Sequence, residues 1–125
     1  MFNKNHISEC KQLLQAFELT QANMLNKKYQ IAREEFLIEI NEMSNLFMQM
    51  KSDLNSGTVV EEKQKLLLLK QIDRLIKFLK EFGAQVDKLD EPDQVSEEEI
   101  LFIFERQYKF KMIYKKHLAD FVALV

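Results

Sequence analysis

The chain has 125 residues, of which only two are glycine and one is proline. Average usage would supply about fifteen glycines and prolines in a chain of this length, which argues against a fold rich in sheets and tight turns. Hydrophobic residues make up 46% of the chain and charged residues 30%. This balance is enough for a core with a charged surface and argues against intrinsic disorder. We therefore expect a single all-helical domain over residues 1–125.

The charges nearly cancel, because 18 basic side chains face 20 acidic ones and leave a net charge of −2. The chain therefore lacks the basic excess with which nucleic-acid-coating proteins displace counterions, and nucleic acid is only a minority hypothesis. The single cysteine, Cys10, cannot form an intramolecular disulfide. The beginning of the chain has no secretory apolar segment, and no stretch approaches the about twenty apolar residues of a membrane span. We expect a cytoplasmic protein that has no membrane segment.

The first segment, residues 6–54, contains no glycine or proline and has helical apolar spacing throughout. As one helix it would be about 70 Å long, whereas a compact domain of this size has a radius of gyration of about 14 Å. Two solutions remain open. The chain either bends near residues 23–28, where Asn23 and Asn26 interrupt the apolar stripe, or continues as one helix that a second copy covers. In both cases the apolar side chains before the bend must be buried, and these are Ile7, Leu13, Leu14 and Phe17.

Two clusters of turn-forming residues, 55–57 and 90–96, separate the first segment from two further helices. A capping box follows each cluster, with Thr58 and Glu61 in the first and Ser96 and Glu99 in the second. Between the clusters, apolar residues recur at intervals of three and four, as in a coiled coil. This seam consists of Leu68, Ile72, Leu75, Leu79, Phe82, Val86 and Leu89. The last segment, residues 97–122, is apolar over a wider arc, which predicts burial on more than one side.

These elements predict an antiparallel helical bundle of three long helices, or of four if the first segment bends near residues 23–28. A hairpin about Gly57 would place an acidic group of the first segment opposite a basic group of the second. The acidic group is Glu34, Glu35, Glu39 and Glu42, and the basic group is Lys70, Arg74, Lys77 and Lys80. The match of charges predicts this register, although each exposed pair contributes only about 0.2–1 kcal/mol.

Candidates for chemistry are few. His6 with Glu9, and His117 with Asp120, have the spacing that places two metal ligands on one helix face. Four-helix carboxylate proteins instead repeat Glu-x-x-His on two helices, and that motif is absent from this sequence. Cys10 lies on the apolar stripe, where a free cysteine behaves as a small hydrophobe, and no glycine-rich loop could hold a phosphate. We expect neither an enzyme nor a metal, and no cofactor.

The excess of methionine and phenylalanine points to protein binding instead, because adaptable apolar surfaces receive helical ligands. The positions predicted to contact a partner lie off the core seam or, for the glycine, allow close approach: they are Leu37, Met48, Leu67, Phe78 and Gly83. We expect an adaptor or scaffold that binds a partner helix through an apolar helix face and that could also associate with a second copy. In size, acidity and helical-hairpin build the chain resembles small bacterial export chaperones, and this architectural resemblance implies a chaperone.

An alternative function rests on residues 106–116, which hold five basic residues, no acidic residue and three aromatic ones. The aromatic residues are Tyr108, Phe110 and Tyr114, and this texture is typical of surfaces that bind single-stranded nucleic acid. A helical regulator that acts on nucleic acid is therefore the second hypothesis. Helical periodicity gives a plainer account, in which the aromatic side chains join the core while Lys109, Lys115 and Lys116 face the solvent.

Overall fold

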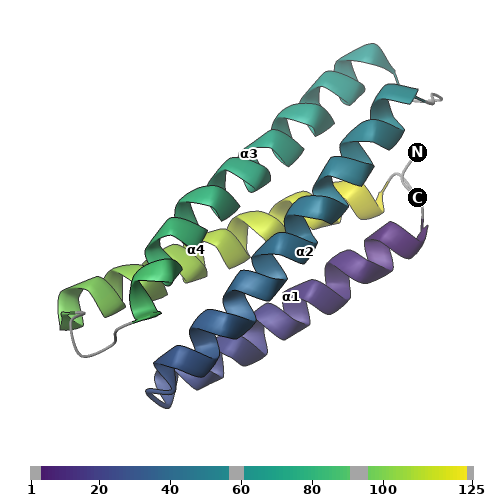
Figure 1. Ribbon diagram of the computed structural model, residues 1–125. Coiled ribbons are helices and arrows are strands. Elements are labelled where there is room, and N and C mark those ends of the chain that lie inside the picture. Colours follow the sequence, from purple (N-terminus) through teal and green to yellow (C-terminus); the bar gives the residue numbers. More distant parts are fainter. Residues whose placement is uncertain (1–3, 57–60, 91–95, 124–125) are drawn as a thin grey trace.

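The structure is a computed structural model, which describes residues 4–56, 61–90 and 96–123. Four α-helices follow one another: α1 (Lys4–Leu25), α2 (Tyr29–Ser56), α3 (Glu62–Val86) and α4 (Glu97–Val122), with a short 3₁₀ segment, η1 (Asp87–Asp90), after α3. They form an antiparallel bundle, in which the beginning of α1 and the end of α4 lie at the same end (Figure 1). The all-helical prediction is confirmed, in its four-helix form.

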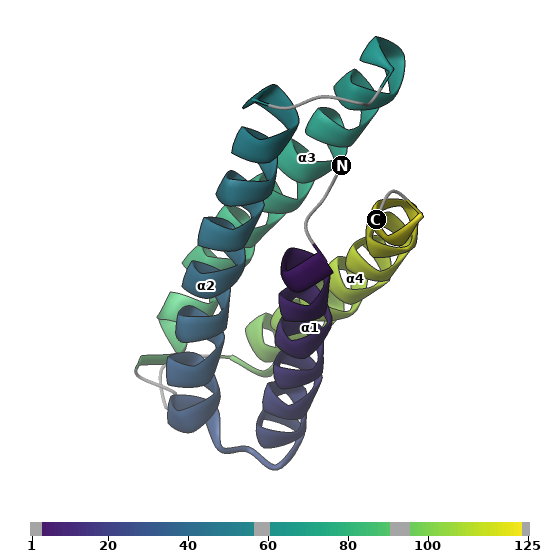
Figure 2. The same ribbon diagram turned by 90° about the vertical axis from the view of Figure 1, so that its right-hand side faces the viewer.

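Each helix packs against the helices before and after it in the chain, and α4 also packs against α1. Seen from the side, α1 and α2 stand next to each other and α3 and α4 lie behind them (Figure 2). This up-and-down arrangement gives each helix one face toward the core and one face toward the solvent. It also means that α1 and α4, which are distant in sequence, share a long interface.

The chain bends between α1 and α2 by a turn of three residues, within the region where the sequence left a bend open. Lys27 has a φ of 60°, the left-handed conformation that ends many helices. Its N–H donates to Met24 O at 3.0 Å, and the N–H of Lys28 donates to Asn23 O at 2.9 Å. These two bonds form a Schellman motif, which satisfies carbonyl groups that the end of α1 would otherwise leave unpaired.

Lys27 is a poor residue for this position, because a side chain makes the left-handed conformation cost about 1–2 kcal/mol. We expect Lys27→Gly to raise the free energy of unfolding by about 0.5–1 kcal/mol, after the larger backbone entropy of an unfolded glycine is subtracted. Urea denaturation of the two proteins measures the difference. Asn26→Gly is the matched control, since Asn26 has no positive φ. An equal gain from Asn26→Gly would contradict the assignment of the strain to Lys27.

The two predicted capping boxes have different outcomes. Ser96 Oγ accepts a hydrogen bond from the N–H of Glu99 at 3.2 Å, so the prediction for the start of α4 is confirmed. The start of α3 was predicted wrongly, because Glu61 itself occupies the N-cap position, without a side-chain cap. The helix therefore begins three residues later than a Thr58 cap requires. Thr58 lies outside the described residues.

Four phenylalanines, one from each helix, meet in the middle of the core. The ring of Phe17 lies 5.1 Å from that of Phe36, 5.5 Å from that of Phe82 and 5.3 Å from that of Phe110, measured between centroids. The Phe36 and Phe82 rings are 5.3 Å apart. The predicted seam of α3 is buried along its whole length, and so are Ile7, Leu14 and Phe17 of α1. The bend thus lets the domain cover the apolar part of α1 by itself.

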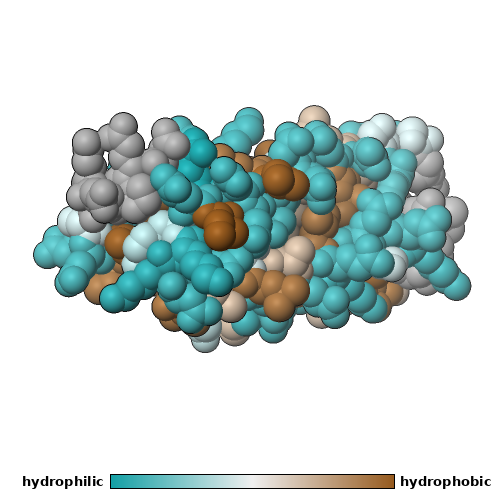
Figure 3. Space-filling view, turned by 60° about the horizontal axis from the view of Figure 1, so that its bottom comes forward, coloured by the Kyte–Doolittle hydropathy of each residue, from teal (hydrophilic) through white to brown (hydrophobic). Residues whose placement is uncertain are grey.

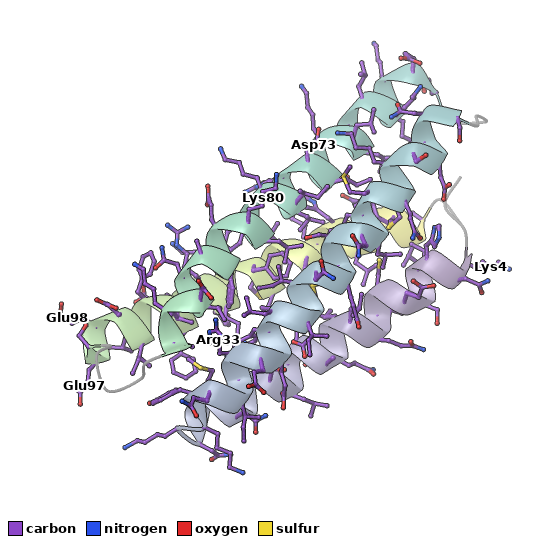
Figure 4. The ribbon with its side chains drawn as sticks, viewed as in Figure 1. Lys4, Arg33, Asp73, Lys80, Glu97 and Glu98 are labelled. Carbon is purple, nitrogen blue, oxygen red and sulfur yellow. The ribbon has the colours of Figure 1, made fainter. Side chains whose placement is uncertain are left out.

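The predicted charge register between α2 and α3 is wrong. The ion pairs that join this hairpin have the opposite polarity: Lys51 Nζ lies 2.7 Å from Asp73 Oδ1, and an Arg33 nitrogen lies 2.6 Å from Asp87 Oδ1 (Figure 4). In the described part of the chain, no ion pair joins the predicted acidic group to the predicted basic group. Glu35 and Glu39 instead bond to Thr20 of α1.

Candidate functional site

The outer side of α4 carries an exposed apolar stripe. Leu101, Tyr108 and Met112 are 60%, 57% and 51% exposed, and their spacing of seven and four residues places them on one line along the helix. Phe104, which is half-buried against the core, flanks this line. We call Leu101, Phe104, Tyr108 and Met112 the α4 stripe. On the face shown in Figure 3, hydrophobic residues form patches among hydrophilic ones.

The inner side of α4 fixes the direction in which the stripe points. Phe110 and Tyr114 are buried, and the Tyr114 hydroxyl donates to Cys10 O of α1 at 2.8 Å. Gln107 Nε2 donates to Phe17 O, also of α1, at 3.3 Å. These buried bonds to backbone carbonyls hold α4 in one rotation about its own axis. The α4 stripe therefore faces away from the core.

A hollow of about 330 Å³ lies beside Tyr108, between α1 and α4. Its lining is Gln21, Phe104, Glu105, Tyr108 and Lys109. Leu25 follows one turn after Gln21 on α1 and is also exposed. The stripe is therefore bordered by a concave apolar surface, which is the shape that receives an apolar side chain of a partner.

The residues that the sequence predicted for partner binding are divided by the structure into two groups. Met48, on the outer side of α2, and Leu67, near the beginning of α3, are exposed. Leu37 and Phe78 are half-buried against the core, and the Phe78 ring packs 5.5 Å from that of Phe110. The contribution of these four residues to partner binding stays a prediction. Met48 is the member of this set that offers the most direct test, because its side chain has a solvent-facing position on a long helix.

Gly83 was expected to allow close approach by a neighbouring helix or a ligand, and the neighbouring helix does not require a glycine there. A Cβ atom at Gly83 would lie 3.8 Å from Ile40 Cδ1, an ordinary van der Waals distance. The nearest neighbour is thus a side chain of α2, and alanine would fit at this position without displacing it.

The α4 stripe was not predicted from the sequence, because apolar residues on two sides of α4 were interpreted as burial on both sides. The buried positions are Ile103, Phe110, Tyr114 and Phe121, whereas Leu101 lies on the opposite side. A helix at the corner of a four-helix bundle buries one arc only. Once four helices are assigned, the second apolar arc of α4 is the signal of an exposed surface.

Residues 106–116 divide in a way that supports the plainer account of this basic and aromatic stretch. Phe110 and Tyr114 are buried, and only Tyr108 of the three aromatic residues is exposed. The Arg106 guanidinium lies 4.9 Å from the centre of the Phe102 ring, so its planar face is already occupied by a cation–π contact. Lys115 Nζ lies 3.4 Å from a carboxylate oxygen of Glu18. The stretch is largely committed to contacts within the bundle.

A cluster of polar side chains lies between α1 and α2. Thr20 Oγ1 lies 2.7 Å from Glu39 Oε2, 3.1 Å from Glu35 Oε2 and 3.0 Å from Ala16 O, and Asn23 Nδ2 donates to Glu35 at 3.0 Å. A hydroxyl has one hydrogen to donate, so it cannot serve three acceptors at once. A proton on Glu39 would reduce the competition from three acceptors to two, because the protonated carboxyl donates to Thr20 and leaves the Thr20 hydrogen for Ala16 O or Glu35.

The surroundings of Glu39 favour that protonated form. Its side chain is only 8% exposed, and burial raises the pKa of Glu39 to about 7. The negative charges of Glu35 and Glu42 raise the pKa further, whereas the hydrogen bond from Thr20 lowers it. No pattern in the sequence indicates this cluster, because it forms only when α1 folds back onto α2.

The residues considered for metal or nucleophilic chemistry include His6, His117 and Cys10. His6 Nδ1 lies 3.2 Å from Asp53 Oδ2, and His117 is buried near the other end of the chain, where burial lowers its pKa. Among the described residues, no group of three or more His, Cys, Asp or Glu side chains could hold a metal ion. Burial raises the pKa of Cys10 to about 11, so its thiol stays protonated and is a weak nucleophile.

The fold and its surface define a small antiparallel four-helix bundle with an exposed apolar stripe on its last helix. No family model, no curated protein and no solved structure matches this chain. None of the helices in the described part of the chain combines the length and the apolar character needed to cross a membrane.

Proposed function

We propose that the protein is a non-enzymatic interaction module, an adaptor or chaperone of the cytoplasm, that binds a helix of another protein across the α4 stripe. The observation that carries the proposal is the line of Leu101, Tyr108 and Met112, which are all more than half exposed. Tyrosine and methionine are enriched at protein interfaces. When a helix packs against a partner, the apolar side chains that make the contact are spaced three, four and seven residues apart.

The free energy of burying apolar side chains supports a role in binding for the α4 stripe. Burying one such side chain contributes about 1.5–3 kcal/mol, and the bundle leaves this contribution unused along the stripe. Glu105 and Lys109 border the hollow beside Tyr108 and add charges at the rim, where they influence orientation more than affinity. The surface thus has an apolar centre with a charged rim, as protein interfaces do.

Two observations weigh against the other classes of function. The protonated, buried thiol of Cys10 speaks against nucleophilic catalysis. The burial of Phe110 and Tyr114 removes two of the three aromatic rings that a nucleic-acid surface over residues 106–116 would use for stacking. Protein binding needs neither a reactive thiol nor exposed rings at Phe110 and Tyr114.

The proposal predicts that Tyr108→Glu weakens partner binding and leaves the bundle folded. A charge placed in an apolar contact is costly to bury, so we expect at least a tenfold weaker interaction. The measurement is affinity capture from extract of the native cell, followed by quantification of each captured protein. Circular dichroism and the thermal midpoint of the variant show whether the fold is retained.

Met48→Glu is the matched control, because Met48 is 55% exposed and Tyr108 57% exposed, but the two lie on different helices. We expect Met48→Glu to retain the partner. If Met48→Glu loses the partner and Tyr108→Glu keeps it, the binding surface is on α2, as the sequence predicted, and the α4 stripe is not used. Capture of nucleic acid with a steep dependence on salt, lost when Lys109, Lys115 and Lys116 are reversed in charge, would contradict the proposal.

A further inference from the structure

Charges are distributed unevenly along the outer side of α4. The half of the helix near its beginning carries exposed acidic residues beside the stripe, and the half near its end carries exposed basic ones. The acidic residues are Glu97, Glu98 and Glu105, and the basic residues are Lys109, Lys115 and Lys116. Glu97 and Glu98 stand at the end of the bundle opposite Lys4 (Figure 4). The α4 stripe therefore lies between an acidic and a basic region.

Helical geometry places these charges on defined flanks of the stripe. At about 100° per residue, Glu97 and Lys115 lie on the Phe104 side of the line of Leu101, Tyr108 and Met112, whereas Glu98 and Lys116 lie on the other side. Two antiparallel helices that face each other bring the same flank of each helix together. A charge on one flank of α4 would then meet the charge at the opposite end of that same flank.

We propose that a second copy of this chain occupies the α4 stripe, with its α4 antiparallel to the first. This inference rests on the proposed function, because it requires the α4 stripe to be a binding surface. A two-fold axis at the level of Arg106 and Gln107 places Leu101 against Met112 of the second copy and Tyr108 against its Glu105. The interface is isologous, which is the commonest symmetry of soluble oligomers.

Charge complementarity selects this arrangement. The same two-fold axis brings Glu98 to Lys116 of the second copy and Glu105 to its Lys109. It also brings Glu97 to Lys115, which already lies 3.4 Å from Glu18 of its own chain. A parallel arrangement would instead place acidic residues against acidic ones and basic residues against basic ones. The resulting repulsion disfavours the parallel arrangement. The Tyr108 hydroxyl can donate to the Glu105 carboxylate of the second copy. Leu25, exposed on the flank of α1 next to α4, would extend the apolar part of the contact.

The test is sedimentation equilibrium of the full chain at concentrations from about 1 to 500 µM, a range that covers the dissociation constants of weak and moderately tight dimers. We expect a reversible dimer for the wild type and a monomer for Tyr108→Glu. Glu98→Lys alone and Lys116→Glu alone each place like charges in contact and should weaken the dimer at least tenfold. The double variant Glu98→Lys/Lys116→Glu restores opposite charges across the axis and should dimerise within threefold of the wild type.

Glu34→Lys is the matched control, since Glu34 is exposed on α2 and should not affect the dimer. Failure of the double variant to recover would overturn the antiparallel geometry, and so would a wild type that stays monomeric over the whole range. The capture experiment distinguishes this failure from a failure of the proposed function. The wild type could remain a monomer and yet capture a different protein, which Tyr108→Glu no longer captures. This result would overturn the second copy as the occupant and would leave the α4 stripe as the binding surface.

Discussion

Phe17→Ala is expected to lower the free energy of unfolding by about 3–5 kcal/mol, the usual cost of removing a large aromatic side chain from a core. Phe17 is completely buried, and its ring contacts those of Phe36, Phe82 and Phe110, one from each of the other helices. No single neighbour can fill the space, because closing it would require all four helices to move. Small domains are stable by only about 5–15 kcal/mol, so this variant should be near the limit of folding.

Urea denaturation measures the loss, with Phe102→Ala as the matched control. Phe102 is 39% exposed and contacts the Arg106 guanidinium, so its removal should cost about 1 kcal/mol or less. Equal losses in the two variants would contradict the assignment of Phe17 to the shared centre of the core. A smaller slope of unfolding energy against urea in Phe17→Ala would indicate that the variant has also lost compactness.

The parts of the fold that could be predicted from the sequence depend on local patterns. The α3 seam is set by spacing alone, and the Ser96 cap by a pair of residues three apart. The bend at Lys27 gave a weaker signal, because lysine occupies a position where glycine or asparagine is usual. What decides the bend is the burial of Ile7 and Phe17, and this depends on α2 and α4. The sequence therefore predicts that these side chains are buried, but it does not determine whether a bend or a second copy buries them.

The candidate site was harder to predict, because it depends on how each helix is rotated in the bundle. Charge alone predicted that Glu35 and Glu39 of α2 pair with basic residues of α3, whereas in the structure their carboxylates face Thr20 of α1. The outward direction of Leu101 and Tyr108 follows from buried contacts of α4 with α1. Such contacts join residues about ninety to one hundred positions apart, and surface charge pairs are too weak to determine register against core packing.

The contribution of Glu39 to wild-type stability is expected to fall as pH rises from about 4.5 to about 7. The pKa of this carboxyl rises from 4.5 to about 7 in the folded protein, so between these values the folded state holds a proton that the unfolded state has released. The free energy of unfolding then decreases with pH. The contribution of Glu39 is fully present below pH 4.5 and lost above pH 7. At about 1.4 kcal/mol per pKa unit, the loss amounts to about 3 kcal/mol.

Glu39→Gln removes this dependence, since glutamine keeps the shape of the side chain and carries no charge. We expect the variant to match the wild type near pH 4.5 and to exceed its free energy of unfolding by about 3 kcal/mol at pH 8. Comparing the two proteins at each pH is necessary, because His117 has a lowered pKa and its titration changes wild-type stability in the opposite direction. That contribution is common to both proteins and cancels in the difference.

Glu34→Gln is the control on the same helix, where the carboxylate is exposed and neutralisation should produce no such pH-dependent difference. Parallel curves for wild type and Glu39→Gln from pH 4.5 to 8 would show that folding does not raise the pKa of Glu39 above its ordinary value. In that case the Thr20 hydroxyl would have to donate to Glu39 alone, with Ala16 O and Glu35 served by other groups. A titration of the Glu39 side-chain carbon by NMR separates these two protonation states directly, since a midpoint near 7 shows that the carboxyl is protonated below that pH.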